Sequence, residues 1–274
     1  MDVKDLIKQS LSEDIGSGDI TTDSLELVKT ITQASVIAKE DGVIAGLNVF
    51  YEVFKQVDPE IKITLYKRDG DKVENKEPIA KLEGNPVSLL KGERVALNFI
   101  QRMSGIASQT AKMVEQLAGT EARLLDTRKT TPMLRQLEKY AVKVGGGLNH
   151  RFGLYDMIML KENHIRAAGS ITKAVGMVKK NNCTYKIEVE VTNLKELQEA
   201  VEAKVDRVML DNMDLESMKK AVALYKGKVE LEASGNVRLE TIREIAETGV
   251  DYISSGAITH SYKSLDISLL FREN

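Results

Sequence analysis

Two adjacent cationic residues, Arg128 and Lys129, stand in the segment DTRKTTP at residues 126–132. The segment follows an apolar run, and its proline cannot donate a strand hydrogen bond, so we expect a loop at the end of a strand. An isolated Arg-Lys pair of this kind is more often solvated surface than a site. Arginine nevertheless offers a planar fork that matches a carboxylate or a phosphate, and lysine adds a point charge that needs no fixed orientation. The pair is therefore a candidate for anion binding.

Further cations follow in the next two segments of the chain. His150 and Arg151 end the glycine-rich segment GGGLNHR, and Lys161 ends the apolar run DMIML. Taken alone, Lys161 could be a rim residue whose aliphatic stem lies on apolar surface. Like charges from consecutive loops, however, converge at tolerable cost only around an anion. We therefore predict that residues 126–164 build a cationic pocket for a small anionic substrate.

Polar residues also recur at the ends of four later apolar runs. Glu190, Asp211, Ser234 and Ser255 follow one another at intervals of 21, 23 and 21 residues. This period is the length of one strand and one helix. It predicts that all four residues lie at the carboxyl ends of neighbouring parallel strands, where an α/β barrel assembles its active site.

These four residues suggest two kinds of ligand. The loops Ser234-Gly235-Asn236 and Ser255-Gly256-Ala257 each offer a hydroxyl group and exposed backbone N–H groups, which suits a phosphate. Glu190 and Asp211 could be ion-pair partners of the cations. We prefer a magnesium site, because Mg²⁺ usually takes one or two protein carboxylates while substrate phosphates and water supply the other ligands.

The elements that must position these residues alternate along the chain. From residue 120 onward, apolar runs typical of strands alternate with segments that have helical spacing, which indicates parallel strands with crossover helices. We count seven strand runs: RLLDT, VKVG, DMIMLK, YKIEVEV, RVMLDN, KVELEAS and DYISSG. The later helices are LKELQEAVEA, MDLESMKKAVALYK and LETIREIAETG. The pattern predicts an α/β barrel.

The first hundred residues have a different arrangement of predicted helices and strands. Helical spacing from Val3 to Leu11 is followed by the alternating segments ITQASVIA and IKITLY, which predict strands of a small α+β unit. A long helix is expected from about Leu89 to Leu117, because apolar residues keep returning to one broad face.

Composition limits the classes of partner and compartment. The chain has 39 Lys and Arg residues against 41 Asp and Glu, so it has no net positive field for nucleic acid or anionic lipid. Cys183 is the single cysteine, which rules out an internal disulfide framework and fits a reducing compartment. No apolar run reaches the roughly 18 residues that span a bilayer. The first residues, MDVKDLIKQSLSED, lack the pattern of a signal peptide, and we expect a cytoplasmic protein.

Together, these motifs closely resemble the quinolinate phosphoribosyltransferase family, also called nicotinate-nucleotide pyrophosphorylases (carboxylating). The resemblance extends over nearly the whole chain. It is carried by EDIGSGDITT, ERVALNFIQRMSGIAS, DTRKTTPMLR, GGGLNHRFGLYDMIMLKENH, EVEV, LDN, EASGN and SSGAITHS. It implies a pentosyltransferase that converts quinolinate and phosphoribosyl pyrophosphate to nicotinate mononucleotide, pyrophosphate and CO₂ in NAD biosynthesis, with Mg²⁺ and no organic cofactor.

The resemblance also implies a role for each candidate residue. The positions that hold the quinolinate carboxylates and the phosphoribosyl donor are matched by Thr127, Arg128, Lys129, His150, Arg151 and Lys161. Glu190 and Asp211 match the ribose and Mg²⁺ carboxylates, and with Lys129 and Lys161 they are the expected catalytic residues. The 5′-phosphate cradle is matched by the loops at 234–236 and 255–257.

The family architecture adds expectations for domains and assembly. It implies an N-terminal α/β open-faced sandwich at residues 1–104, joined by the C-terminal segment 265–274. An open seven-stranded TIM-like α/β barrel with the active site would occupy residues 105–264. The resemblance further implies a homodimer in which Arg94 reaches the neighbouring subunit's site, and a hexamer stays open as a larger assembly.

Two other functions remain open at this point. One is a phosphoribosyltransferase of similar fold that uses nicotinate and releases no CO₂, for which a second cation for a second carboxylate would be surplus. The other is a non-catalytic or differently specialised paralogue, such as the relatives found with molybdate transport systems.

Overall fold

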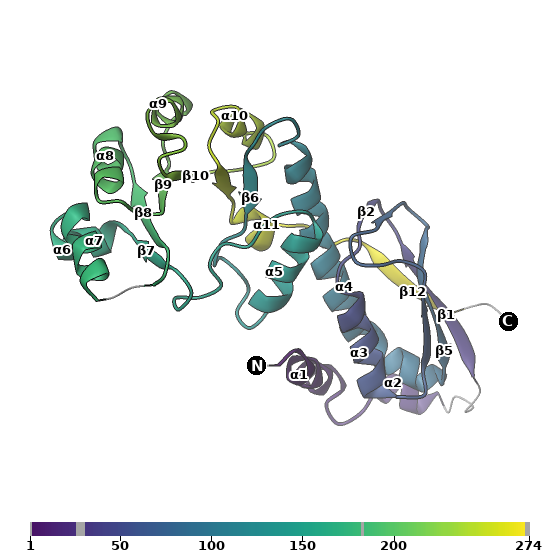
Figure 1. Cartoon of the computed structure of the whole chain (residues 1–274). Helices are drawn as coiled ribbons and strands as arrows, with labels where there is room; N and C mark the ends of the chain where they lie inside the picture. The colour runs from purple at the N-terminus through teal and green to yellow at the C-terminus, as the bar shows by residue number, and fades with distance from the viewer. Residues whose placement is uncertain (1, 26–30, 182–183, 272–274) are drawn as a thin grey trace. The chain divides into compact units, whose positions relative to one another are not determined.

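The computed structural model describes residues 2–25, 31–181 and 184–271 (Figure 1). Cys183 lies outside these residues. The chain divides into two compact units, each described by itself below: a first unit of residues 1–109, 136–145 and 262–274, and a second unit of residues 110–135 and 146–261. The sequence-based domain boundary after residue 104 falls inside a continuous helix, near this division, and stays a prediction.

A four-stranded antiparallel sheet organises the first unit. Its strand order is β12-β1-β5-β3, and the C-terminal strand therefore pairs directly with the first one. The predicted strands ITQASVIA and IKITLY are confirmed as β1 and β3. The bounds are Thr32–Ala38 for β1, Lys62–Leu65 for β3, Pro78–Gly84 for β5 and Ile267–Phe271 for β12, and a separate two-stranded sheet pairs β2 (Gly42–Val43) with β4 (Lys72–Val73).

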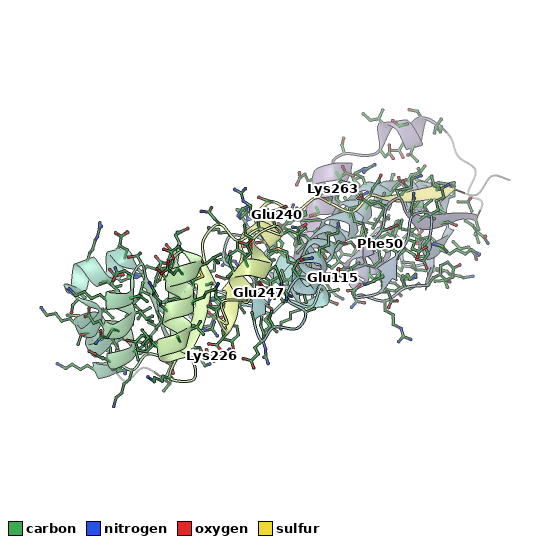
Figure 2. All side chains as sticks on the ribbon, turned by 90° about the horizontal axis from the view of Figure 1, so that it is seen from above. Phe50, Glu115, Lys226, Glu240, Glu247 and Lys263 are labelled. Atoms are coloured by element: carbon green, nitrogen blue, oxygen red, sulfur yellow. The ribbon has the colours of Figure 1, made fainter. Side chains whose placement is uncertain are left out.

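Helices and the core of the first unit follow from apolar spacing. The predicted N-terminal helix is confirmed as α1. On α3, Phe50 and Phe54 are fully buried and meet edge to face, with ring centroids 5.1 Å apart (Phe50 is labelled in Figure 2). The helices of this unit are α1 (Val3–Ile15), α2 (Ile20–Ser24), α3 (Leu47–Val57), most of α4 (Pro86–Glu115) and most of α5 (Arg135–Val144).

The predicted long helix is confirmed as α4. Its buried face carries Val95, Phe99 and Met103. At Gly105 a side chain would meet the Lys263 carbonyl oxygen and would lie 2.8 Å from the Ser264 Cα atom. Glycine is therefore required here for close approach of two backbone segments.

Parallel strands form the second unit, which confirms the predicted α/β class and the TIM-like arrangement. The sheet has six strands in the order β6-β11-β10-β9-β8-β7. Their bounds are Arg123–Leu125 for β6, Ile158–Leu160 for β7, Ile187–Val191 for β8, Arg207–Asp211 for β9, Glu230–Ser234 for β10 and Tyr252–Ser254 for β11.

The prediction of seven strands is wrong by one within the described residues. The run VKVG is the end of helix α5 and the turn after it, because Leu137, Ala141 and Val142 return to one buried face of that helix. Leu148, a few residues later, makes a single parallel bridge to Leu125 of β6. The expected second strand is thus reduced to one bridge.

Helices connect the parallel strands as predicted. LKELQEAVEA and MDLESMKKAVALYK form α8 and α9, whereas LETIREIAETG contributes only the short α10. α8 packs against β8 and β9. The helices of this unit are α6 (Glu162–Ala168), α7 (Ile171–Lys180), α8 (Leu194–Glu202), α9 (Leu215–Tyr225), α10 (Ile242–Ala246) and α11 (Ala257–His260).

Alternation along the strands gives the parallel sheet two different faces. Glu188 and Glu230 are both paired in register with Arg207, so the three side chains share one face. The intervening Val189 and Val208 are fully buried on the other face. One face of the sheet is therefore charged, although the strands read as apolar runs.

No helix among the described residues is long and apolar enough to cross a membrane.

Candidate active site

The four periodic polar residues lie where the sequence places them. Glu190 is the penultimate residue of β8, Asp211 ends β9 and Ser234 ends β10. Ser255 directly follows β11, and Asp211 and Ser234 are partners in register. The prediction that these residues gather at the carboxyl edge of the sheet is confirmed.

The DTRKTTP loop after β6 is anchored from two sides. The Arg135 guanidinium donates to the Thr130 hydroxyl at 3.0 Å and to the Arg128 carbonyl at 3.3 Å. The Thr259 hydroxyl donates to the Lys129 carbonyl at 2.8 Å. The Lys129 side chain is exposed, whereas Arg128 is half-buried and its Nε has no hydrogen-bond partner in the described part of the chain. The backbone is thus fixed while both cations remain available.

Asp126 fixes the second cationic segment to the end of β6. Its fully buried carboxylate accepts hydrogen bonds from the Asn149 side chain at 2.5 Å and from the His150 N–H at 2.9 Å. The half-buried Arg151 donates from Nη1 to the Met157 carbonyl at 3.2 Å. Burial and the neighbouring Arg128 lower the pKa of Arg151. Arg128 and Arg151 are therefore close enough to repel each other, as expected of cations awaiting an anion.

Lys161 and Glu190 form an ion pair that links β7 and β8 at this edge. Lys161 precedes α6, and its backbone N–H donates to Nδ1 of His164 at 3.0 Å. His164 thus has a structural partner at the start of α6. The side chain of Lys161 is half-exposed and can turn toward a ligand.

The loop after β10 contains two successive residues in the left-handed region. Gly235 and Asn236 have φ angles of +101° and +50°. A side chain at Gly235 would collide with Asn212, whose backbone nitrogen would lie 3.0 Å from the added Cβ. Successive left-handed residues of this kind form a concavity that suits an anion.

Ser255 joins the two glycine loops. Its buried hydroxyl donates to the Val237 carbonyl at 3.0 Å and accepts from the Ala257 N–H at 3.3 Å. A side chain at Gly256 would lie 2.8 Å from Cδ of Lys129. The lysine stem therefore runs along the glycine loop, and the cationic loop and the candidate phosphate loop are contiguous.

Family models match almost the entire sequence. Residues 19–104 match the quinolinate phosphoribosyl transferase N-terminal domain, and residues 106–270 match the C-terminal domain of the same family. The chain belongs to the quinolinate phosphoribosyl transferase family. It is therefore related to enzymes that transfer a phosphoribosyl group.

Named relatives and solved structures agree with this membership. A "Quinolinate phosphoribosyltransferase [decarboxylating] 2b, mitochondrial" from Nicotiana tabacum is 45% identical over 98% of this chain and 82% of the relative. A "Probable nicotinate-nucleotide pyrophosphorylase [carboxylating]" from Bacillus subtilis is 44% identical over 98% of this chain and 93% of the relative. The structure of the nicotinate-nucleotide pyrophosphorylase from Francisella tularensis matches with a TM-score of 0.96 and 47% identity, covering 98% of this chain and 96% of that one.

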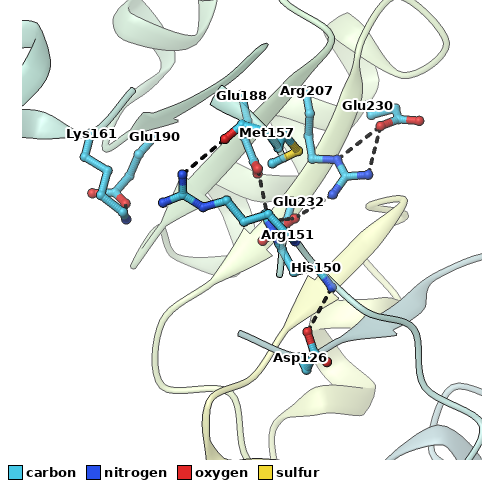
Figure 3. Close-up of polar contacts among 10 residues, drawn as sticks. All are labelled: Asp126, His150, Arg151, Met157, Lys161, Glu188, Glu190, Arg207, Glu230 and Glu232. Carbon is cyan, nitrogen blue, oxygen red and sulfur yellow. Dashed lines mark hydrogen bonds and ion pairs between the residues drawn. The ribbon is translucent and has the colours of Figure 1, made fainter. Parts of the chain in front are cut away.

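The second unit also contains charged residues near His150 that were not predicted from the sequence. Glu188, Arg207 and Glu232 lie on the charged face of the sheet next to His150 (Figure 3). Glu188 and Glu232 are fully buried. The sequence offers only a weak signal, a glutamate inside each apolar run, at the second position of IEVEV and the third of ELEAS.

His150 differs most from its expected setting. It is 8% exposed, and Nε2 lies 3.0 Å from Glu188 and 3.3 Å from Glu232. Nδ1 accepts the Arg151 N–H at 2.7 Å. Both ring nitrogens are thus turned to protein groups, and the expected direct contact with substrate stays a prediction.

Arg94 lies apart from these residues in the chain. It is exposed on α4, in the first unit. Its expected role across a subunit interface also stays a prediction.

Proposed function

We propose that this chain catalyses the reaction of quinolinate with phosphoribosyl pyrophosphate to give nicotinate mononucleotide, pyrophosphate and CO₂ in NAD biosynthesis. The observation that carries the proposal is the junction of Lys129 with the Gly256 loop, since it joins a cationic site for carboxylates to a loop suited to phosphate. The family membership and the names of the relatives support the same activity.

The proposed substrate contacts divide between the two ends of the site. Arg128 and Arg151 would hold the two carboxylates of quinolinate, because a guanidinium binds a carboxylate through two parallel hydrogen bonds. The loops at 234–236 and 255–257 would hold the 5′-phosphate through backbone N–H groups. Lys161, which can leave Glu190 for a ligand, would lie between quinolinate and the pyrophosphate of the donor.

The proposed chemistry follows from these charges. The pyridine nitrogen bonds to the anomeric carbon while the bond from that carbon to pyrophosphate breaks, and the electron pair leaves with pyrophosphate. Positive charge therefore develops on the ribose and negative charge on the leaving group. Preorganised groups such as Glu190 for the first charge and Lys129 for the second lower the barrier.

Decarboxylation follows on the same ring. The bond between the ring carbon and the carboxylate adjacent to the ribosylated nitrogen breaks, and its electron pair stays on the carbon beside the cationic nitrogen. A proton then replaces the released CO₂. A water-poor site favours this step, because a charged carboxylate is less stabilised there than in water.

We also propose that Glu190 and Asp211 hold Mg²⁺. They fit by the chemistry of the donor set: two half-buried carboxylates at neighbouring strand ends, one of which already faces the Lys161 cation. Mg²⁺ takes one or two such carboxylates and completes its shell with water and phosphate oxygens. When bound, the ion would neutralise negative charge on the pyrophosphate group.

A cytoplasmic location and a homodimer complete the proposal. The single cysteine suits a reducing compartment. Names of plant relatives include mitochondrial and chloroplastic forms, so cell fractionation is the relevant measurement.

Substrate use distinguishes this activity from its alternatives. We expect quinolinate labelled at the carboxyl group beside the ring nitrogen to release labelled CO₂ only when phosphoribosyl pyrophosphate is present. Release of pyrophosphate from nicotinate, with no reaction of quinolinate, would instead identify a nicotinate-specific enzyme. Absence of quinolinate binding in calorimetry would favour a non-catalytic paralogue.

A lysine variant in the proposed site can be compared with a control variant at the surface in the same assay. Lys129→Ala should lower kcat/KM by about a hundredfold or more, because a charge aimed at the leaving group is lost. Lys220→Ala removes an equal charge from a surface pair with Glu216 on α9 and should leave the rate within about twofold.

A further inference from the structure

Four charged or ionisable side chains form a cluster inside the second unit: His150, Glu188, Arg207 and Glu232. Glu188 on β8 and Glu232 on β10 are fully buried, and both approach the buried His150 ring. Buried carboxylates are tolerated only with charged or hydrogen-bonding partners. The positions of Glu188 and Glu232 therefore depend on the groups with which they are paired.

Arg207 fixes the position of Glu232. Its Nη1 donates to Glu232 at 3.1 Å, and its Nε and Nη2 donate to Glu230 at 3.1 and 3.0 Å. The guanidinium also stacks on the Tyr252 ring, 4.0 Å from the centroid. With three carboxylate contacts and one ring contact, Arg207 has little freedom, and neither has the Glu232 oxygen that faces His150.

The His150 ring connects the two carboxylates to the backbone of Arg151. Its Nε2 edge faces the two carboxylates, which directs Nδ1 toward the Arg151 N–H, 2.7 Å away. His150 is also tied through its own N–H to Asp126. Figure 3 shows Arg151 next to His150, with its side chain extending in the direction of the Lys161–Glu190 pair.

Opposing influences act on the protonation of this ring. Burial disfavours the imidazolium, while the nearby carboxylates of Glu188 and Glu232 favour it and raise the pKa of His150 to about 9. The Arg151 N–H acts against a second proton, because it needs a lone pair on Nδ1. A pKa of about 9 corresponds to protons on both ring nitrogens at neutral pH, whereas the Arg151 N–H, 2.7 Å from Nδ1, leaves no room for a proton there. We follow the geometry, which requires the neutral ring with the proton on Nε2.

A metal ion is a weaker explanation of the same residues. Ligand atoms of His150, Glu188 and Glu232 lie within 4.8 Å of one another. However, Glu232 is already bound by Arg207, and Nδ1 of the ring by the Arg151 N–H. Glu232 and the His150 ring are thus already bound to other protein groups.

We propose that Glu188 and Glu232 are positioning residues that orient Arg151 through the His150 ring and thereby set the affinity for the dicarboxylate substrate. This inference rests on the proposed function, because it takes quinolinate as the ligand of Arg151. The carboxylates act on the backbone to which the guanidinium is attached and need not touch the substrate. Their effect should therefore be confined to one of the two substrates.

Steady-state kinetics with each substrate varied separately test the proposal. Glu188→Leu and Glu232→Leu should each raise the KM for quinolinate at least tenfold and leave the KM for phosphoribosyl pyrophosphate within twofold. Glu188→Gln should restore most of the affinity, since its amide oxygen can still accept the Nε2 proton. Glu216→Leu is the control, because it removes a carboxylate from the exposed pair with Lys220 on α9, and its KM for quinolinate should stay within twofold.

Equal changes in both KM values, or no change in either, would overturn the proposal. A ¹⁵N NMR measurement on the unaltered protein covers the case in which a leucine variant does not fold: at assay pH, Nδ1 of His150 should be unprotonated and Nε2 protonated. A proton on Nδ1 excludes the hydrogen bond from Arg151 and also overturns the proposal. If the unaltered protein does not turn over quinolinate, the proposed function itself is wrong. That result differs from the outcomes above, which all require an active unaltered protein or a proton on Nδ1.

Discussion

The ion pair between Lys161 and Glu190 shows how single residues prepare this site. Each side chain belongs to a different strand end, and each is also a candidate ligand: the lysine for pyrophosphate and the carboxylate for ribose or Mg²⁺. Pairing them keeps two charges compatible while no substrate neutralises either one. When substrate and Mg²⁺ bind, Lys161 can exchange Glu190 for the pyrophosphate, and Glu190 can exchange Lys161 for the ribose or the metal ion. Neither charge is then left unpaired.

Tyr140 offers a residue-scale prediction in the first unit. Its hydroxyl donates at 2.7 Å to Asp69, whose carboxylate also accepts the Gly46 and Leu47 N–H groups at the start of α3. Burial, and then the hydrogen bond and charge of Asp69, raise the pKa of Tyr140 to about 12 from 10.0. We expect the absorbance titration of the protein, minus that of Tyr140→Phe, to show a group near this value.

The sign of the pH effect follows from the direction of this shift. The folded state holds the neutral phenol more strongly than the unfolded chain does, so its contribution to the free energy of unfolding is complete below pH 10 and disappears as the pH rises through about 12. Asp69→Asn should lower the pKa of Tyr140 toward 10.0, since the negative charge of Asp69 is then lost while the effect of burial remains. A pKa of 10 in the unaltered protein would contradict the hydrogen bond.

Single residues also mark the limit of sequence reasoning at this scale. Arg128, Lys129 and Arg151 were identifiable because cations in loops are conspicuous. Glu188 and Glu232 were not, because a glutamate within a short apolar run reads equally well as a residue on a solvated face. The difference depends on which face of the strand meets His150, and that contact joins residues far apart in the chain.

At the scale of elements, local periodicity and tertiary pairing have different predictive power. The helices α8 and α9 and the four periodic strand ends were predictable, since each repeats a pattern within one strand-helix unit. The prediction of a strand at VKVG was wrong because a short apolar run fits either a strand or the end of an amphipathic helix. Only the preceding buried positions of α5, such as Leu137 and Ala141, separate the two.

Gly105 gives the prediction that belongs to this scale. In a helix, glycine to alanine normally stabilises by about 0.5–1 kcal/mol. At Gly105, however, the added methyl group meets the Lys263 carbonyl and the Ser264 backbone, which cannot move aside as a side chain can. We expect Gly105→Ala to lower the free energy of unfolding by about 1–3 kcal/mol in denaturant titrations.

Gly176 provides the matched control for this substitution. It is also within a helix, α7, and an added Cβ has no atom within 4 Å. Gly176→Ala should therefore be neutral or stabilising. Equal effects of the two substitutions would show that helix propensity alone, and not the approach of the segment at 263–264, determines the requirement at Gly105.

At the scale of the whole molecule, one expected site residue stands in a different unit from all the others. Arg94 is exposed on α4 in the first unit, and the remaining candidates belong to the second. An exposed arginine on a helix is ordinary by itself. The resemblance to the quinolinate phosphoribosyltransferases adds the specific hypothesis that this arginine completes the site of a second subunit.

Mixing two inactive variants tests this hypothesis directly. Arg94→Ala and Lys161→Ala should each abolish turnover. If Arg94 acts across the interface, a dimer with one subunit of each kind contains one complete site, formed by the intact Lys161 of one subunit and the intact Arg94 of the other. After free exchange of subunits, about a quarter of the sites should recover, because half of the dimers are hybrids and each has one complete site. Arg94 acting within its own subunit gives no complete site in any mixture.

The double variant Arg94→Ala/Lys161→Ala is the control for this experiment. Mixed with Arg94→Ala, it contributes the same interface but no intact Arg94, so no activity should return. Tags of different mass on the two variants show whether hybrids have formed. Hybrids without recovered activity would contradict a shared site, and the arginine would then have to act within its own chain or only in the folding of α4. Recovery in the first mixture and not in the second would make the dimer, rather than the single chain, the smallest active form.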